Sequence, residues 1–206
     1  RSEDTASLGL VRRALAKQPA DWRSSGGPWQ VAETADDWPA DAVRADELHD
    51  AGATAVEQLA AALAEAADRL AAQTGAGASL DAAARRLSFV FAVGPTYFLE
   101  IAKLRAARCL WRRVLDSLAP DAPAGAPTAM RLYVRTARAG SNPDDASLNL
   151  LRATTEAMSA VIGGADALFV EPAGFDAALA LNVQRILADE AHLDAVADPA
   201  AGSYFV

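Results

Sequence analysis

Apolar residues recur at steps of three and four along much of the chain, which is the spacing of an amphipathic helix. This pattern predicts helices over residues 54–72, 97–118, 142–162 and 175–190. The inner face predicted for the first helix consists of Val56, Leu59, Leu63, Ala67 and Leu70. The inner face predicted for the second consists of Phe98, Ile101, Ala102, Arg105, Cys109 and Val114. The inner face predicted for the third consists of Leu148, Leu151, Thr155, Met158 and Ile162.

Short apolar runs alternate with these helices and predict strands. Residues 87–93 are continuously apolar except for one serine, and shorter runs occupy residues 130–134 and 167–170. Such runs are typical of strands buried on both faces of a parallel sheet. The alternation of helix and strand predicts an α/β fold of parallel βα units, and both a doubly wound sheet and a (β/α)8 barrel fit it. A complete barrel needs about 250 residues, so this chain is too short to close one alone.

The first part of the chain has a weaker pattern. Residues 7–17 predict a short helix and residues 29–31 a short strand. The acidic, proline-containing segment 34–45 predicts an exposed loop. We therefore expect residues 1–45 to form an arm and an early barrel segment, and residues 46–206 to form a partial barrel domain.

Composition and charge narrow the class of protein. About half of the 206 residues are apolar and the net charge is −8, which argues against nucleic-acid binding because that needs clustered lysine and arginine. No apolar run approaches the ~18 residues of a membrane span, and the first residues lack a secretory core. The lone Cys109 suits a reducing compartment and is expected to be a small buried apolar residue. A cytoplasmic location without membrane contact is expected.

The residues that could carry chemistry are few. The chain has no glycine-rich phosphate loop and no serine-hydrolase elbow, and its two histidines, His49 and His192, are expected at the surface or at helix ends. Arg86 precedes a predicted strand, and Arg135 and Arg138 follow one. Arginine binds phosphate or carboxylate well, and ligands of parallel sheets lie at strand ends. These arginines are therefore either anion contacts or surface ion-pair partners, and this reasoning does not name a reaction.

One ion pair is expected inside a helix. Glu100 and Lys103 lie three residues apart in the predicted helix 97–118. Residues at this spacing are neighbours on a helix surface, so we expect a local pair with a structural role.

Residues 86–111 closely resemble the methylmalonyl-CoA mutase family, whose pattern reads R-L-S-F, then G-x-N-F-F-M-E-I-A-K-L-R-A-A-R-x-L-W. The resemblance continues in residues 50–53, 151–158, 163–167 and 198–204, and together it covers residues 46–206. It implies a (β/α)8 barrel, incomplete or degenerate here, that holds a CoA thioester along its axis. It also implies a separate adenosylcobalamin domain and a radical rearrangement of methylmalonyl-CoA to succinyl-CoA, in which the cofactor supplies the radical.

The chain departs from the catalytic members of that family at two motifs. Their tyrosine–histidine pair falls on Asp46 and Glu47, where two acids would repel an anionic substrate. Their R-T-H-x-Q-T-S-G-W motif corresponds to residues 135–141, which lack the histidine and the glutamine. Residues 163–167 and 190–193 resemble the small subunit of heterodimeric mutases, a degenerate copy that pairs with an active chain.

The resemblance therefore implies a non-catalytic small subunit that supports a catalytic large subunit. The D-x-H-x-x-G cobalamin motif is missing from the sequence, so adenosylcobalamin is expected on the partner or on another domain. The candidate substrate or CoA contacts are Arg86, Arg135, Arg138 and Ser141. Two alternatives stay open: an active acyl-CoA mutase chain with further segments, and a divergent CoA-binding or scaffold protein without mutase activity.

Overall fold

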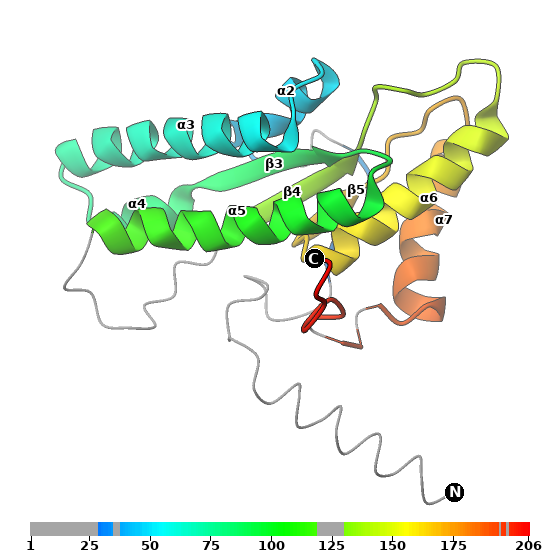
Figure 1. The fold of residues 1–206 in the computed structure, drawn as a ribbon. Helices are drawn as coiled ribbons and strands as arrows, with labels where there is room; N and C mark the ends of the chain where they lie inside the picture. Colours follow the sequence, from blue (N-terminus) through cyan, green and yellow to red (C-terminus); the bar gives the residue numbers. More distant parts are fainter. Residues whose placement is uncertain (1–28, 35–37, 119–129, 194, 197) are drawn as a thin grey trace, which may run out of the picture.

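The computed structural model describes residues 29–34, 38–118, 130–193, 195–196 and 198–206 (Figure 1). The strands are β1 (Gln30–Val31), β2 (Val43–Arg44), β3 (Ser88–Val93), β4 (Arg131–Thr136) and β5 (Ala167–Phe169). The helices are α2 (Ala45–Asp50), α3 (Ala55–Gly75), α4 (Leu80–Arg86), α5 (Tyr97–Leu118), α6 (Ala146–Ile162), α7 (Ala177–Arg185) and the π-helical turn η2 (Ile186–Glu190). The predicted helix 7–17 lies outside the described residues.

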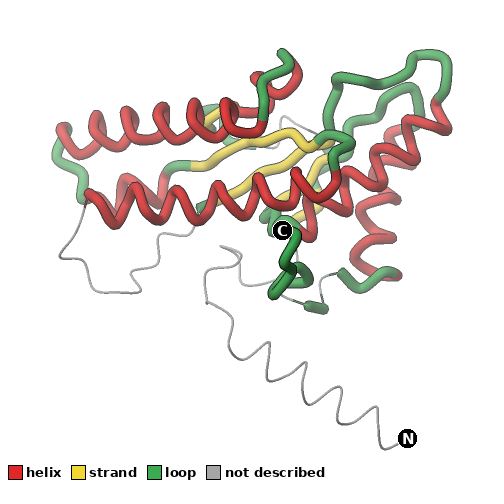
Figure 2. Tube along the Cα trace, in the orientation of Figure 1, coloured by secondary structure: helices red, strands yellow, loops and turns green. Residues whose placement is uncertain are grey.

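The five strands form one parallel sheet in the order β1-β5-β4-β3-β2. The α/β class and the parallel pairing are confirmed. From β2 to β5, each strand lies beside the next strand of the chain, and β1 lies on the far side of β5. Because all strands are parallel, their carboxyl ends and the loops that follow them meet at the same edge of the sheet (Figure 2).

The two faces of the sheet pack against different partners. Phe89 and Phe91 point into the main core, which joins the sheet to α3, α5, α6 and α7. On the other face, Val90 belongs to a smaller cluster with Trp38 and Phe169. This alternation follows from the two-residue repeat of a strand. Both sides of β3 are therefore covered, as its continuous apolar run predicted.

The predicted exposed loop 34–45 is wrong in its later part. Trp38 is only 8% exposed, and its ring lies 6.1 Å from that of Tyr133 and 6.2 Å from that of Phe169. Val43 is fully buried in strand β2. The acidic and proline residues hid the short strand β2, of which Val43 is buried and Arg44 is exposed, whereas the strand predicted at residues 29–31 is present as β1.

The long helices occur where predicted, but their buried faces match the prediction only in part: Leu70 and Ile101 are buried as expected, whereas other predicted residues are not. Val56, Phe98 and Leu151 are 74%, 52% and 63% exposed, and Cys109 is exposed as well. Each buried stripe includes alanine, as in Ala62 and Ala66 of α3, Ala107 of α5, and Ala153, Ala157 and Ala160 of α6. A sequence pattern weighted towards large apolar residues selects a neighbouring stripe when small side chains let the helices approach closely.

Several element ends also shift. The helix 54–72 begins at Ala55, because Thr54 is its N-cap and forms a capping box with Glu57. The helix predicted from residue 142 begins at Ala146 after the N-cap Asp145. Strand β4 extends to Thr136 and therefore includes Arg135. Within the described residues, no helix is long and apolar enough to cross a membrane.

Candidate functional site

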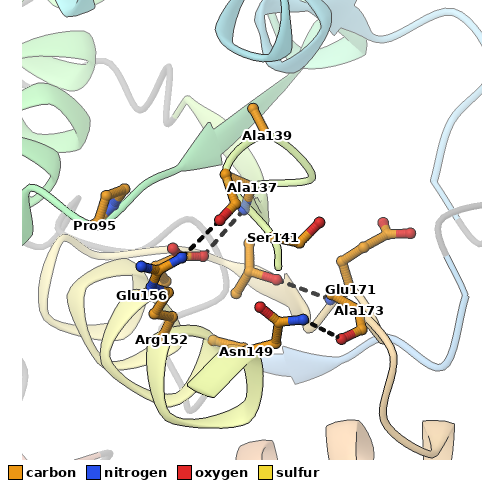
Figure 3. Close-up of a pocket in the computed structure, with 12 residues that line it drawn as sticks. Pro95, Ala137, Ala139, Ser141, Asn149, Arg152, Glu156, Glu171 and Ala173 are labelled. Carbon is orange, nitrogen blue, oxygen red and sulfur yellow. Dashed lines mark hydrogen bonds between the residues drawn. The ribbon is translucent and has the colours of Figure 1, made fainter. Parts of the chain in front are cut away.

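A cavity of about 330 Å³ lies at the carboxyl edge of the sheet (Figure 3). It is lined by Pro95, Thr136, Ala137, Ala139, Gly140, Ser141, Asn149, Arg152, Ala153, Glu156, Glu171 and Ala173. These residues come from α6, from the last position of β4, and from the segments that follow β3, β4 and β5. Parallel α/β proteins place their ligands at this edge, so the cavity is the candidate site.

Asn149 joins the two longest loops of the cavity wall. Its Nδ2 donates to the carbonyl oxygens of Asn142 at 2.6 Å and of Ala173 at 2.8 Å, and its Oδ1 accepts from the N–H of Asn142 at 2.8 Å. The amide thus uses both donor hydrogens and its acceptor to hold the loop after β4 and the loop after β5, and Figure 3 shows its bond to Ala173. The wall of the cavity is therefore fixed by side-chain bonds.

Glu156 is the buried acid of the cavity. Glu156 is 6% exposed, and its Oε2 accepts a hydrogen bond from the N–H of Ala137 at 3.2 Å. Burial raises the pKa of this carboxyl to about 7, the negative charge of Glu100 adds to the rise, and the Ala137 N–H and Arg152 oppose it. Sequence reasoning missed Glu156, and the only signal was an acid inside an otherwise apolar helical stripe.

Arg135 lies in β4, with its side chain 1% exposed, and forms a buried ion cluster. Its Nε donates to Asp46 Oδ2 at 2.8 Å and its Nη2 donates to Asp50 Oδ2 at 2.5 Å. Asp46 is fully buried and also accepts two bonds of 2.8 Å from Arg44. Burial raises the pKa of Asp46, but the hydrogen bonds and charges of the two arginines outweigh this and lower the pKa overall. The charge of Asp46 is thus compensated within the protein, which corrects the expectation that it repels a substrate.

The other candidate residues lie in two places. Arg138 is half exposed, its Nε lies 3.1 Å from Glu171 Oε2, and its carbonyl accepts from Ser141 Oγ at 3.2 Å. Ser141 and Glu171 line the cavity. Arg86 is exposed in the last turn of α4, at the amino end of β3, and forms no ion pair with the described residues. The structure therefore brings Arg138 and Ser141 together and leaves Arg86 at the opposite end of the sheet.

A second polar chain runs beside the cavity. Lys103 is buried, and its Nζ lies 2.5 Å from Glu100 Oε2 and donates to Gln58 Oε1 at 3.0 Å. The predicted ion pair in α5 is confirmed, but it lies inside the protein. Gln58 Nε2 in turn lies 3.1 Å from His49 Nδ1. Because lysine only donates, Gln58 Oε1 must accept, so its Nε2 donates and His49 Nδ1 accepts. Burial lowers the pKa of His49, and the charge of Lys103 adds to this.

His49 therefore presents a neutral ring with its proton on Nε2. This ring lies against Gly94, where an added Cβ would come within 3.1 Å of Nε2. It is half-buried at the end of α2, so the predicted helix-end position is correct, although the hydrogen-bonded environment was not foreseen. His192 adopts a positive φ of 51° just after η2.

Comparison with known proteins identifies the family to which this chain is similar. A family profile of methylmalonyl-CoA mutase matches residues 30–206. The methylmalonyl-CoA mutase of Cereibacter sphaeroides is 38% identical over 167 residues, which cover 77% of this chain and 23% of that protein. The methylmalonyl-CoA mutase small subunit of Porphyromonas gingivalis is 39% identical over 80% of this chain and 28% of its own length. The small subunit of Streptomyces virginiae is 39% identical over 77% and 26%.

The aligned part of the chain spans about a quarter of the length of these relatives. The match nevertheless includes every described strand and helix, with the cavity and the Arg135 ion cluster. The chain belongs to the methylmalonyl-CoA mutase family, which is a family of isomerases.

Proposed function

We propose that this chain acts as the non-catalytic small subunit of an adenosylcobalamin-dependent mutase that converts methylmalonyl-CoA to succinyl-CoA. In this proposal it supports a catalytic large subunit in a heterodimer. The observation that carries the proposal is the position of Asp46, which aligns with the tyrosine of the catalytic pair. Asp46 is fully buried and bound by Arg44 and Arg135, so its side chain serves the fold and is withheld from a ligand.

The lining of the cavity supports the same role. Ala137 and Ala139 stand where the resemblance places a histidine and a glutamine in catalytic chains, and both line the cavity. Methyl groups at these positions supply neither a proton donor nor an acceptor to a reacting group. The catalytic side chains are thus replaced in two motifs, one in α2 and one after β4. Replacements of this kind are expected in a subunit that does not carry out catalysis.

The sheet fits an arc of a (β/α)8 barrel. Strands β2 to β5 are parallel neighbours in chain order, the helices α3, α5, α6 and α7 pack on one face, and a second apolar cluster covers the other face. A barrel has this arrangement, with helices outside and packed side chains inside. The proposed partial barrel domain covers residues 46–206, with β1 and β2 preceding it in the chain and joining the same sheet.

Adenosylcobalamin is proposed to be bound by the partner chain or by another domain. Among the described residues, no group of three or more histidine, cysteine or acidic side chains is arranged to hold a metal ion. His49 Nδ1 already accepts from Gln58. These residues do not fit cobalt ligation, so we assign no step of the reaction to a cofactor on this part of the chain.

The candidate ligand contacts fall into two groups in this proposal. Arg138 and Ser141, at the cavity, would contact the acyl end of a CoA thioester. Arg86, at the other end of β3, would contact the far end of the same elongated ligand. Arg135 is proposed to serve the fold, because both of its acidic partners belong to the protein itself.

The test is a mutase assay on purified proteins. This chain, a catalytic large subunit and the purified pair are each supplied with adenosylcobalamin and methylmalonyl-CoA, and succinyl-CoA formation is measured. We expect no turnover by this chain alone, and a stable complex with the large subunit that turns over. The substitution Glu47→Gln, at the exposed position aligned with the catalytic histidine, should leave the turnover of the pair unchanged. Turnover by this chain alone would refute the proposal and favour an active acyl-CoA mutase.

A further inference from the structure

Most polar groups that line the cavity already have partners in the protein. Asn149 uses its whole amide on the two loops, and Ser141 Oγ donates to the carbonyl of Arg138. Thr136 Oγ1 accepts from the N–H of Glu171, whose carboxylate is paired with Arg138. Of the charged side chains in the lining, Glu171 is thus paired, whereas Glu156 and Arg152 of α6 form no ion pair with the described residues.

Glu156 is the first of these groups. The residue is 6% exposed, and one backbone N–H at 3.2 Å is the hydrogen-bond partner of its side chain within the described residues. It forms no ion pair in the described part of the chain. A carboxyl group has about four acceptor sites when ionised, and a buried polar group without enough partners is costly. Glu156 can therefore take up a further partner from inside the cavity.

Arg152 is the second group and lies one helical turn before Glu156. Its Nη1 donates to the carbonyl of Gly140 at 2.7 Å, which holds the guanidinium at the rim of the cavity (Figure 3). A guanidinium has five N–H donors, so most of its donors remain for a ligand. It is the one cation among the lining residues.

We propose that the cavity binds a compact carboxylate, which accepts hydrogen bonds from the Arg152 guanidinium and from a protonated Glu156 carboxyl. The volume of about 330 Å³ is at the lower end of ligand pockets, which suits a short-chain acid. An amine is disfavoured because it would lie beside Arg152 with the same sign of charge. The site lies in the cavity given above to the acyl end of a CoA thioester, but it needs no partner subunit and is tested on this chain alone.

Burial, more than the surrounding charges, keeps Glu156 protonated and available as a donor. On α5, Glu100 faces it and is paired with Lys103, and Arg152 is the charged neighbour on its own helix. Across the cavity, Glu171 is paired with Arg138. Burial raises the pKa of Glu156 to about 7, so a large fraction carries a proton near neutral pH. A carboxylate ligand would hold that proton between two carboxyl groups.

The experiment is a titration of the full chain with propionate, followed by NMR at pH 6 and pH 8. Propionate stays ionised over this range, so only Glu156 changes its charge at the site. If the protonated form binds, the apparent Kd increases by the inverse of the protonated fraction. With a pKa of about 7, the Kd should be about tenfold higher at pH 8 than at pH 6.

Two variants and a control define the outcome. Glu156→Gln keeps a donor without a titrating proton, so its Kd should be the same at both pH values and close to that of the native chain at pH 6. Arg152→Gln should weaken binding at least tenfold at pH 6, whereas Arg85→Gln, which removes an exposed helical arginine elsewhere, should not. No binding at 100 mM propionate, affinity that increases with pH, or a pH dependence that survives Glu156→Gln would overturn the proposal.

Discussion

Replacing Arg135 by methionine removes the centre of the buried ion cluster and leaves a shorter, unbranched apolar side chain in its place. The variant loses the charged hydrogen bonds to Asp46 at 2.8 Å and to Asp50 at 2.5 Å. Each such bond contributes about 1.5–3 kcal/mol, and breaking a buried ion pair costs about 3–5 kcal/mol. Asp46 keeps its two bonds from Arg44, so it is not left unpaired. We therefore expect a loss near the lower limit, about 3 kcal/mol of unfolding free energy.

Urea unfolding followed by circular dichroism measures this loss. With an m-value of about 2 kcal/mol per molar urea, the midpoint of Arg135→Met should fall by about 1.5 M relative to the native chain. The matched control is Arg85→Met, which removes an exposed i,i+4 pair with Asp81 and should leave the midpoint unchanged. An unchanged midpoint for Arg135→Met would show that the cluster does not stabilise the fold, and would remove the structural role assigned to Asp46.

Three further predictions concern protons and packing. The folded pKa of Asp46 lies below its unfolded value of 3.8, so its stabilisation is complete above that pH and should be lost in acid unfolding as the pH falls through the folded pKa. Glu156 has the opposite sign: its folded pKa of about 7 exceeds the ordinary 4.5, so stability is lost as the pH rises between them, by about 3 kcal/mol at about 1.4 kcal/mol per pH unit. Glu156→Gln should abolish that loss, so melting curves of the native chain and the variant should differ in slope against pH from 5 to 8. At Gly163, an added Cβ would come within 2.7 Å of Leu104 Cδ1, so Gly163→Ala should cost about 1–3 kcal/mol in urea unfolding, whereas Gly75→Ala, with open space around it, should not destabilise.

Periodicity predicted the long elements well because each carries a strong local pattern. The apolar run of β3 and the full length of α5 could be read directly, and the α/β class followed from their alternation. The buried faces could not be predicted in the same way. Alanine carries little weight in a hydrophobic pattern, but its small side chain lets two elements pack closely. Strand β2 was also missed, because its two residues form a strand through their pairing with β3 and not through a pattern of their own.

The candidate site could be predicted only in outline. Arg135 and Arg138 were correctly expected near the end of a strand. Their acidic partners Asp46 and Glu171 lie 89 and 33 positions away in the chain, so no local spacing predicts these pairs. The same holds for the chain from Lys103 through Gln58 to His49, which joins three helices. Glu156 gave no usable signal, because its burial depends on the loop after β4 closing over α6.

The amide of Asn149 forms hydrogen bonds to both cavity loops. A single side chain bonds the carbonyl of Asn142 on one loop and that of Ala173 on the other. Neither loop can therefore move outward without breaking a bond to Asn149. One side chain of α6 therefore stabilises both loops, so amide protons on both are expected to gain protection from exchange with solvent through it. The shape of the cavity therefore depends on one lining residue that binds both of its longest loops.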